Sequence, residues 1–409
     1  MNRGRRLLVE LVRRSGRGSR FPVALLAGLV LLAGCSSPTA PVGPKPNRTR
    51  FEERLVVLPA TQVGGHLIIE TRLDRRGVAR FLIDTGSSVT LLSPEFATRV
   101  GSGPSAYDGP QVRVRGADGR VSALPSVAVR RLELGEARFE DVQALLYDFS
   151  TLSAHLGIRI DGILGFPLFR DTVLTLDYPG SRVLLAPVGE PGLIPGSAFS
   201  FNALSRVPLI PVQVGDRTLL VLIDSGSDGP FNLNPIGIDP AFASAPRPGA
   251  TVSTLAGEEV QAVGRLEDSL RIGNYVLPRP IVHLTDQLSS LGGEVLKHFI
   301  LTLDQTRGRV TFYRDSPEAI ESPVRRSAGL AFAKTPAYWR VDSVVPGSPA
   351  DAAGIQTGEL ITRINGEPVE QWDLVRFDEL TRTAARIEFT FIEGRTEIPR
   401  SVDVFALVP

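Results

Sequence analysis

Asp84 is the residue whose surroundings first suggest chemistry in this sequence. It ends an apolar run, Phe81-Leu82-Ile83, and it is followed by the small turn Thr85-Gly86-Ser87-Ser88 and a second apolar run from Val89 to Leu92. A buried strand that stops at an acid and turns on a glycine would place the carboxylate at the base of a cleft, with nearby hydroxyls to hold its oxygens. The same residue types also form ordinary solvent-facing hairpin turns, so this stretch alone is a weak signal.

The pattern recurs 140 positions later along the chain. Val221 to Leu233 repeats the apolar run, the acid Asp224, the small hydroxyl residue, the glycine and the serine. If the two acids are neighbours in the fold, their like charge raises one pKa and the pair holds one shared proton. One carboxyl could then act as a general base toward water while the other acts as a general acid.

Together the two loops resemble the aspartic proteases of the pepsin and retropepsin type, in which two such loops meet on a pseudo-two-fold axis. The resemblance implies that Asp84 and Asp224 are the catalytic pair. It also implies hydroxyls that brace one loop against the other (Thr85, Ser225), serines that hydrogen-bond the carboxylates (Ser87, Ser227) and the glycines Gly86 and Gly226. The fold that it implies is mainly β, with two retropepsin-like β-barrel lobes that form one pepsin-like bilobal unit.

Asp228 departs from the repeat, because Ser88 stands at the corresponding place in the first loop. A side chain pointing into the cleft would add a third negative charge and raise the pKa of the pair further. We expect it to face solvent instead, because Gly229-Pro230 marks a turn just after it.

Other hydrolytic chemistry finds little support in the residue types. No two of the four histidines share a metal-ligand spacing (His66, His155, His283, His298). Cys35 is the single cysteine, and Ser87 and Ser88 have no histidine in a recognisable nucleophile context. We therefore expect neither a metal nor a cofactor.

The elements that must position the acids also repeat in order. Hairpin tips carrying glycine follow each acid loop, at Gly116 and Gly119 and again at Gly257, and Leu174-Thr175-Leu176-Asp177 recurs as Leu301-Thr302-Leu303-Asp304. Repeated order at a near-constant offset predicts two equivalent lobes, at residues 51–190 and 191–322. The resemblance makes these tips flap candidates, and the absence of tyrosine from them is closer to retropepsins than to pepsins.

A buried segment should thread beneath each acid loop if the resemblance holds. Ile163-Leu164-Gly165 matches that segment in the first lobe, although any sandwich would also contain such a strand. Gly292-Gly293-Glu294-Val295-Leu296 stands at the corresponding place in the second lobe as a degenerate copy.

Residues 325–409 predict a third, small α+β unit. Strands alternate with a short helix after Ser348-Pro349, a tight turn at Asn365-Gly366 and an amphipathic helix candidate from Glu370 to Thr383. The order resembles a PDZ domain of the bacterial protease-linked kind, which implies that Gly329, Leu330, Ala331 and Phe332 form the carboxylate-binding loop for protein C-termini. A PDZ fold that only packs on the protease lobes is the alternative.

The N-terminus has the composition of a targeting segment. Residues 1–34 hold seven arginines and one acid, a charge of +6, which leaves −5 for the rest of a chain whose total is +1. A mildly acidic remainder gives no electrostatic reason to expect nucleic-acid binding. The ending Leu32-Ala33-Gly34-Cys35 resembles a bacterial lipoprotein cleavage box, so we expect lipidation at Cys35, a proline-rich tether over 35–50 and, because serines follow, the outer membrane facing the periplasm. An ordinary secretory signal is the alternative.

These observations predict a membrane-anchored aspartic endopeptidase that cleaves protein or peptide substrates and uses its PDZ domain to recruit them. The alternative is a catalytically silent protease fold that serves as a peptide-binding scaffold. Because both acid loops lie in one chain, we expect a monomer. The identity of the substrate does not follow from the residues.

Overall fold

The computed structural model describes residues 45–72, 77–101, 109–116, 119–189, 194–254, 257–335, 337–372 and 374–409. The predicted signal peptide, Cys35 and most of the predicted tether lie outside these residues. Strand β1 already begins at Arg48 and pairs with a strand of lobe 1, so strand structure starts inside the range 35–50. Among the described residues, no helix is long and apolar enough to cross a membrane.

Lobe 1 is built mainly from strands, with two short helices. Its elements are β1 (Arg48–Phe51), β2 (Val56–Val63), β3 (His66–Arg72), β4 (Val78–Asp84), β5 (Thr90–Leu92), α1 (Pro94–Arg99), β6 (Gln111–Arg115), β7 (Val121–Leu134), β8 (Ala137–Leu146), α2 (Ser150–Leu156), β9 (Gly162–Gly165), η3 (Phe166–Phe169), β10 (Thr172–Asp177) and β11 (Arg182–Pro187). Ser93 caps α1 by accepting the Phe96 N–H at 3.1 Å, and Pro94 opens the helix.

Lobe 2 repeats the order with fewer helical residues. Its elements are β12 (Ser197–Ser200), β13 (Leu209–Val214), β14 (Arg217–Ile223), β15 (Phe231–Leu233), β16 (Arg247–Thr254), β17 (Gly257–Arg265), β18 (Leu270–Ile272), β19 (Tyr275–Leu277), β20 (Ile281–Leu284), β21 (Ser290–Leu291), α3 (Gly293–Leu296), β22 (Ile300–Asp304) and β23 (Arg309–Tyr313). Nine of these strands form a sheet in the order β16-β17-β20-β15-β21-β14-β13-β18-β19.

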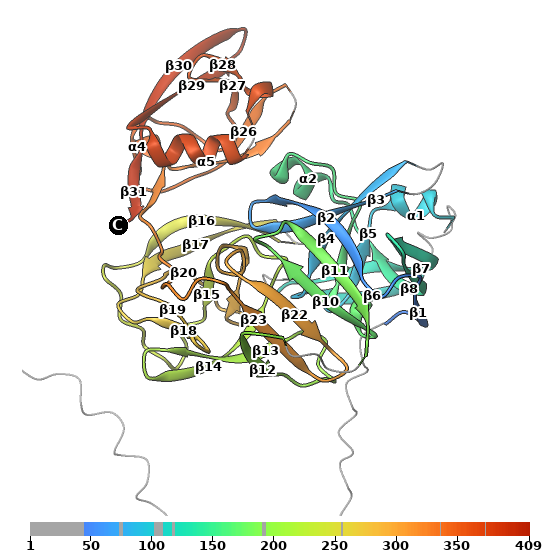
Figure 1. Cartoon of the computed structure of the whole chain (residues 1–409). Helices are drawn as coiled ribbons and strands as arrows, with labels where there is room; N and C mark the ends of the chain where they lie inside the picture. The colour runs from blue at the N-terminus through green and yellow to red at the C-terminus, as the bar shows by residue number, and fades with distance from the viewer. Residues whose placement is uncertain are drawn as a thin grey trace, which may run out of the picture. The chain divides into compact units, whose positions relative to one another are not determined.

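Strands of the two lobes join in one sheet. The order β12-β23-β22-β10-β11-β2-β3-β4-β9-β5-β8-β7-β6 passes from lobe 2 to lobe 1 between β22 and β10, which lie side by side in Figure 1. These are the two copies of the repeated Leu-Thr-Leu-Asp segment, and they pair antiparallel with Thr175 opposite Thr302 and their hydroxyls 3.1 Å apart. The prediction of a mainly β fold is therefore confirmed, and the lobes are continuous with each other through the repeated strands.

Large apolar side chains account for the cohesion of the two lobes. One buried cluster extends through both of them and includes Phe81 and Phe166 from lobe 1 and Phe231 and Phe299 from lobe 2, all at most 1% exposed. Burying an aromatic or branched side chain contributes about 1.5–3 kcal/mol. Because the cluster includes Ile83 and Ile223, which directly precede the two acids, the acid loops begin on well-packed strands.

The C-terminal unit has the α+β composition predicted for residues 325–409. Its elements are β24 (Arg325–Ser327), β25 (Leu330–Lys334), β26 (Trp339–Val344), α4 (Pro349–Ala352), β27 (Leu360–Ile364), β28 (Glu367–Pro368), η4 (Val369–Gln371), α5 (Leu374–Thr383), β29 (Arg386–Glu393), β30 (Thr396–Asp403) and β31 (Phe405–Val408). The sheet β25-β26-β27-β29-β30 leaves β25 at its edge, whereas β24 pairs with β31 in a separate ribbon. Rings of Phe332, Trp339, Phe377 and Phe389 form its aromatic core.

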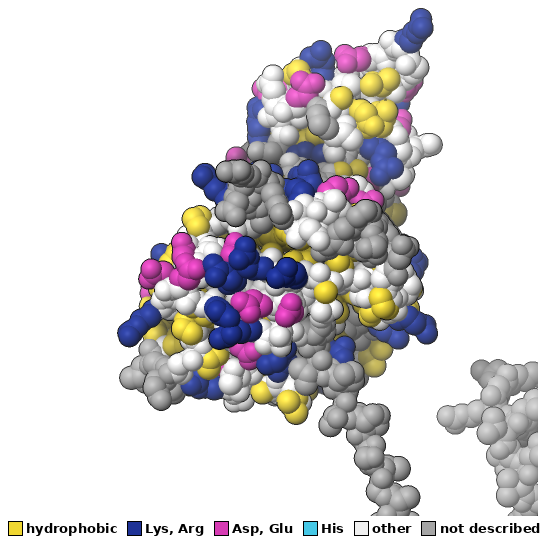
Figure 2. Space-filling view, turned by 90° about the vertical axis from the view of Figure 1, so that its right-hand side faces the viewer, with side chains coloured by type: hydrophobic (Ala, Val, Ile, Leu, Met, Phe, Trp, Pro, Cys, Tyr) yellow, Lys and Arg dark blue, Asp and Glu magenta, His cyan; other side chains and the backbone are white. Residues whose placement is uncertain are grey.

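Charged side chains of both signs are mixed over the face of the molecule drawn in Figure 2, where Lys and Arg side chains alternate with Asp and Glu. Among the charged side chains of lobe 1, Arg50 pairs with Glu140 and Arg138 pairs with Glu133. A continuous basic surface that could follow a phosphate backbone is not visible on the described part of this face.

Candidate active site

Each acid stands at the end of a buried strand that has a parallel neighbour. β4 ends at Asp84, and β9 runs beside it with Asp84 opposite Gly165. In lobe 2, β14 ends one residue before Asp224, and β21 runs beside it with Ile223 opposite Leu291. The two acid loops therefore leave their lobes in equivalent ways, as the sequence repeat predicts.

The two loops hold each other through buried hydroxyls. Thr85 Oγ1 donates to the carbonyl of Ile223 at 2.6 Å and accepts the Ser225 N–H at 3.1 Å. Reciprocally, Ser225 Oγ donates to the carbonyl of Ile83 at 2.8 Å and accepts the Thr85 N–H at 3.0 Å. Because Thr85 and Ser225 are fully buried, all four bonds are made away from water and keep the loops in register.

The carboxyl groups of Asp84 and Asp224 hydrogen-bond each other. Asp84 Oδ1 also accepts the N–H groups of Gly86 at 2.8 Å and Ser87 at 3.0 Å, and Asp224 Oδ1 accepts the Gly226 N–H at 3.1 Å. A Cβ on Gly86 would collide with the Asp224 carboxyl, and a Cβ on Gly226 would collide with the Asp84 carboxyl. The glycines are therefore required for the close approach of the two acids.

The environments of the two carboxyls separate their pKa values. Burial raises the pKa of Asp84 to about 6, against the lowering effect of the N–H groups of Gly86 and Ser87. Burial and then the negative charge of Asp84 raise the pKa of Asp224 to about 8. At neutral pH the coupled pair therefore holds one proton, and the larger upward shift of the Asp224 pKa favours that proton on Asp224.

Ser87 and Ser227 hydrogen-bond the carboxylates, as the resemblance implied, but through their backbone N–H groups and not through their hydroxyls. Ser87 Oγ donates to the carbonyl of Val89 at 2.8 Å, and Ser227 Oγ accepts the Gly229 N–H at 3.2 Å. The backbone N–H of Ser87 supplies the bond to Asp84 instead. The prediction of a hydroxyl bond from Ser87 is wrong because a short side chain competes first for the turn of its own loop.

Threading strands lie beneath both loops. In lobe 1, Phe166 N–H donates to the carbonyl of Ser87 at 3.0 Å, just after Gly165. In lobe 2, the equivalent bond joins Gly293 N–H to the carbonyl of Ser227 at 2.7 Å, so the threading segment is Ser290-Leu291-Gly292 and the predicted segment begins two residues too late. A Cβ on Gly165 or Gly292 would collide with a loop carbonyl, which explains both glycines.

Two residues near the acids were not predicted from the sequence. Tyr178 is fully buried, its hydroxyl has no partner among the described residues, and burial together with the charges of Asp224 and Asp84 raises its pKa. Its counterpart after the repeated strand is Gln305, which donates to the carbonyl of Phe166 at 2.6 Å. The sequence signal that could have identified both residues is their position, since each directly follows one copy of the repeated Leu-Thr-Leu-Asp segment. Asp228, by contrast, is exposed.

The hairpins named as flaps follow the acid loops in the chain. In lobe 1, the tip between β6 and β7 is closed by Gly116 N–H donating to the carbonyl of Arg120 at 2.8 Å. A Cβ on Gly119 would lie 2.9 Å from the side-chain nitrogen of Gln287, so this tip reaches lobe 2. In lobe 2, Gly257 begins β17 opposite Thr254, next to tip residues outside the described part of the chain.

The loop assigned to carboxylate binding begins at a left-handed glycine. Gly329 has φ +80°, its N–H donates to Ser327 Oγ at 2.9 Å, and its carbonyl accepts the Val345 N–H at 2.8 Å. Leu330 and Ala331 continue into the edge strand β25, whereas Phe332 turns into the core and is 5% exposed. β25 is an edge strand, and an edge strand next to such a loop can accept an extended peptide, but here β25 also contacts α2 of lobe 1.

Metal-ligating residues do not gather in the described residues: no group of three or more His, Cys, Asp or Glu side chains there could hold a metal ion.

Comparison with known proteins agrees with the two kinds of domain. Residues 69–168 match the family "Aspartyl protease", and residues 340–390 match the family "PDZ domain". A search of the curated proteins found no match.

Solved structures with likeness to this chain fall into the same two groups. A retropepsin-like aspartic protease from Rickettsia conorii is 16% identical, with 34% of this chain and 92% of that chain covered and a TM-score of 0.25. The HtrA3 PDZ domain bound to a phage-derived ligand is 22% identical, covering 20% and 86%, with a TM-score of 0.18. A PDZ domain protein from Parabacteroides distasonis ATCC 8503 is 20% identical with a TM-score of 0.18, and the match spans only 20% of either chain. The two family matches show an aspartyl protease domain within lobe 1 and a PDZ domain in the C-terminal unit.

Proposed function

We propose that this chain is an aspartic endopeptidase of the bacterial cell envelope, with Asp84 and Asp224 as its catalytic pair. The observation that carries the proposal is the pair of acid loops, braced through Thr85 and Ser225 so that their carboxyls hydrogen-bond each other. A structural turn would not need two half-buried acids in contact, because bringing like charges together costs free energy.

The pKa order assigns the roles in the reaction. Ionised Asp84 takes a proton from a water molecule held at the pair while the water oxygen bonds to the carbonyl carbon of the peptide. Protonated Asp224 gives its proton to the carbonyl oxygen, so the intermediate is a neutral diol. The amide nitrogen then takes up the proton from Asp84 while one hydroxyl of the diol returns its proton to Asp224. The C–N bond breaks to give an acid and an amine, and the carboxyl pair again shares one proton.

A cleavage assay on a disordered protein tests the catalytic pair. We expect Asp84→Asn and Asp224→Asn each to lower kcat at least about 1,000-fold, because each removes one of the two proton-transfer partners. Asp216→Asn is the matched control, since Asp216 is exposed in the turn between β13 and β14. Full activity in either Asp84→Asn or Asp224→Asn would contradict the catalytic pair, and a peptide-binding scaffold would then be the remaining function.

The PDZ domain would recruit substrates by their C-termini. An extended peptide would add beside β25, with its carboxylate at the N–H groups of the loop Gly329 to Phe332. Fluorescence polarisation with peptides that differ only in a free or amidated C-terminus tests this. Equal binding of both peptides would remove the carboxylate from the recognition.

Lipidation at Cys35 would place the enzyme at the membrane, on the outer membrane facing the periplasm. The sequence Leu32-Ala33-Gly34-Cys35 supports this, together with the serines that follow. A labelled fatty acid should be incorporated into the wild-type chain but not into a Cys35→Ser variant. On cell fractionation the variant should be found in the soluble fraction and not with the membranes. Two acid loops in one chain also favour a monomer, which sedimentation of the form lacking residues 1–35 would test.

A further inference from the structure

A polar cluster in lobe 2 occupies a place that is apolar in lobe 1. Asn232 on β15 lies opposite His283 on the parallel strand β20 and opposite Ser290 on the antiparallel strand β21. In lobe 1 the same strand pairings place Leu91 on β5 opposite Leu145 and opposite Ile163. The strand framework therefore does not require polar groups here, because the other half of the same molecule uses leucine and isoleucine.

Different segments cover the two places. In lobe 1, residues 147–161, which include α2, contribute Phe149, Leu156 and Ile160 to one buried cluster with Leu91 and Leu145. In lobe 2 the connection between β20 and β21 is only residues 285–289. The side chain that contacts His283 from outside the lobe is Arg325, from β24 at the start of the PDZ unit.

The bond between Arg325 and His283 determines the state of the imidazole. Arg325 Nη1 lies 2.7 Å from His283 Nε2, and a guanidinium can only donate, so Nε2 accepts and the ring proton sits on Nδ1. His283 is 4% exposed, and burial together with the charge of Arg325 lowers its pKa. Nδ1 is buried without a partner among the described residues and faces the acid loop, 3.3 Å from where a Cβ of Gly229 would stand.

Asn232, which is paired in register with His283, hydrogen-bonds the loop of Asp224. Its amide nitrogen lies 3.3 Å from Ser227 Oγ and 2.9 Å from Ser290 Oγ. Ser227 in turn bonds the Gly229 N–H through its hydroxyl and the Gly293 N–H through its carbonyl, and its own N–H bonds the Asp224 carboxyl. In lobe 1 the residue paired like Asn232 is Leu91, which makes no such bond, so this support belongs to the second acid loop alone.

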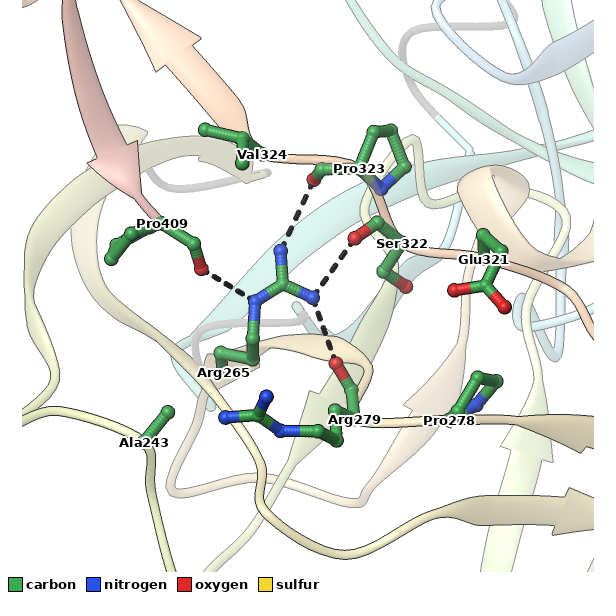
Figure 3. Close-up of a pocket in the computed structure, with 9 residues that line it drawn as sticks. All are labelled: Ala243, Arg265, Pro278, Arg279, Glu321, Ser322, Pro323, Val324 and Pro409. Carbon is green, nitrogen blue, oxygen red and sulfur yellow. Dashed lines mark hydrogen bonds between the residues drawn. The ribbon is translucent and has the colours of Figure 1, made fainter.

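Arg325 is held in place because the ribbon of β24 and β31 is tied to lobe 2. Leu407 and Val408 of β31 pack against Val263 and Ile281, and Ile281 lies on the same face of β20 as His283, two residues away. Figure 3 shows the second attachment, where the guanidinium of Arg265 donates to the carbonyls of Arg279, Ser322, Pro323 and Pro409. The segment that leads into the PDZ unit and the C-terminal segment of that unit thus both contact lobe 2 close to Arg325.

We propose that Arg325 is a positioning residue of the active site, which holds the Asp224 loop in its working geometry through His283 and Asn232. The inference rests on the proposed proteolytic function. It makes the protease depend on the ribbon of β24 and β31. In lobe 1 the place beside Leu91 is covered by residues of lobe 1 itself, whereas in lobe 2 His283 is contacted by Arg325 of the PDZ unit. Loosening the loop should admit water to Asp224 and lower its pKa toward the ordinary carboxyl value.

The test measures kcat, KM and the pH profile of Arg325→Met, His283→Leu and the double variant. We expect each single variant to lower kcat about tenfold with KM within about twofold, and to shift the basic limb of the profile to lower pH. The double variant should be no worse than Arg325→Met alone, because Arg325→Met already breaks the connection through His283 and also removes the ion pair with Glu294 at 3.9 Å. Arg325→Lys keeps one donor for Nε2 and should recover part of kcat.

Two results would overturn the proposal. One is a fall in the midpoint of thermal unfolding with kcat per titrated active site and the pH profile unchanged, which is the result of a structural role alone. The other is an additive loss in the double variant. Arg130→Met, at an exposed arginine on β7 of lobe 1, is the matched control and should change neither quantity.

A readout without turnover separates this proposal from the proposed function. In protein labelled with ¹³C at the aspartate carboxyl, the apparent pKa of Asp224 should be lower in Arg325→Met than in the wild-type chain, whether or not peptides are cleaved. If the wild-type chain cleaves nothing, the proteolytic function fails while this measurement still tests the connection. An unchanged Asp224 titration would refute the connection even in an active enzyme.

Discussion

Asp84 and Asp224 are the same residue type in nearly the same loop, yet their surroundings give them opposite protonation states. Each carboxyl accepts two backbone N–H groups that favour its anion, but the charge of Asp84 also raises the pKa of Asp224. The difference arises because, after burial, the charge of Asp84 is the largest influence on the pKa of Asp224, whereas the N–H groups of Gly86 and Ser87 influence the pKa of Asp84 more than Asp224 does. Acid and base roles are thus assigned by a small asymmetry between two similar loops.

The pH dependence of activity follows from these values. With the pKa of Asp84 at about 6 and that of Asp224 at about 8, one carboxyl is ionised and the other protonated between those values. We expect kcat/KM to be highest in that interval, to fall below about 6 as Asp84 gains a proton, and to fall above about 8 as Asp224 loses its own. Initial rates from pH 4 to 10 measure this. A maximum near pH 3 to 4 would contradict the assigned pKa values.

Stability should respond to pH in the opposite sense from most carboxyls. The folded pKa of Asp224, about 8, is above its ordinary value of 3.8, so the folded state binds the proton more tightly and loses stability as pH rises from 3.8 through about 8. Asp224→Asn removes that loss. We expect its midpoint of thermal unfolding to exceed that of the wild-type chain by about 4 °C or more at pH 8, and much less at pH 4. An equal difference at both pH values would argue against a raised pKa.

At the scale of the element, strand pairing turns two distant acids into neighbours. The repeated strands β10 and β22 pair with each other across the lobes, while β9 and β21 run beneath the acid loops. Thr85 and Ser225 then fix the two acid loops relative to each other with four buried hydrogen bonds. The position of each carboxyl is therefore set by strands of both lobes, so the site and the fold share their stabilising contacts.

Substitution of Thr85 tests this shared stabilisation. Thr85→Val keeps the shape but removes the oxygen that bonds the Ile223 carbonyl and the Ser225 N–H, and it leaves both buried groups unpaired. We expect the free energy of unfolding to fall by about 2–4 kcal/mol, as two such groups should cost. Thr85→Ser keeps the hydroxyl and should lose about 1 kcal/mol or less. Urea unfolding measures both variants, and equal stabilities would show that the cross-loop bonds contribute little.

At the scale of the whole molecule, the PDZ unit and lobe 2 share an attachment. Arg265 donates to carbonyls at both ends of the PDZ unit, and burial beside the charge of Arg279 lowers its pKa without removing its proton. The same attachment places Arg325 against His283. Peptide recruitment and catalysis would therefore be linked by one ribbon and not by a loose linker.

Removing the Arg265 side chain should loosen that attachment without unfolding either part. We expect Arg265→Met to increase the rate of limited proteolysis between residues 314 and 324 several-fold, because the carbonyls of Ser322 and Pro323 lose their donor. Arg247→Met, at an exposed arginine on β16, is the control. An unchanged cleavage rate at this segment would show that the packing of Leu407 and Val408 is enough to hold the ribbon.

Much of the site could be predicted because its signals are local. The acid, hydroxyl and glycine of each loop lie within four residues, and the repeat marks them twice. The hydroxyl of Ser87 was assigned to the wrong partner, since the choice between a loop carbonyl and a carboxylate depends on distances of a few tenths of an ångström. The lobe 2 threading segment was placed two residues late, because Ser290 replaces the apolar residue that marks it in lobe 1.

The residue order alone determined the two acid loops, the order of strands and hairpins in each lobe and the PDZ unit, because alternating burial, turn glycines and repeated segments act over short stretches of chain. Tertiary structure alone decided which acid keeps its proton and that Arg325 meets a buried histidine 42 positions away. Both depend on the dielectric surroundings and on contacts between distant strands, which no local pattern encodes.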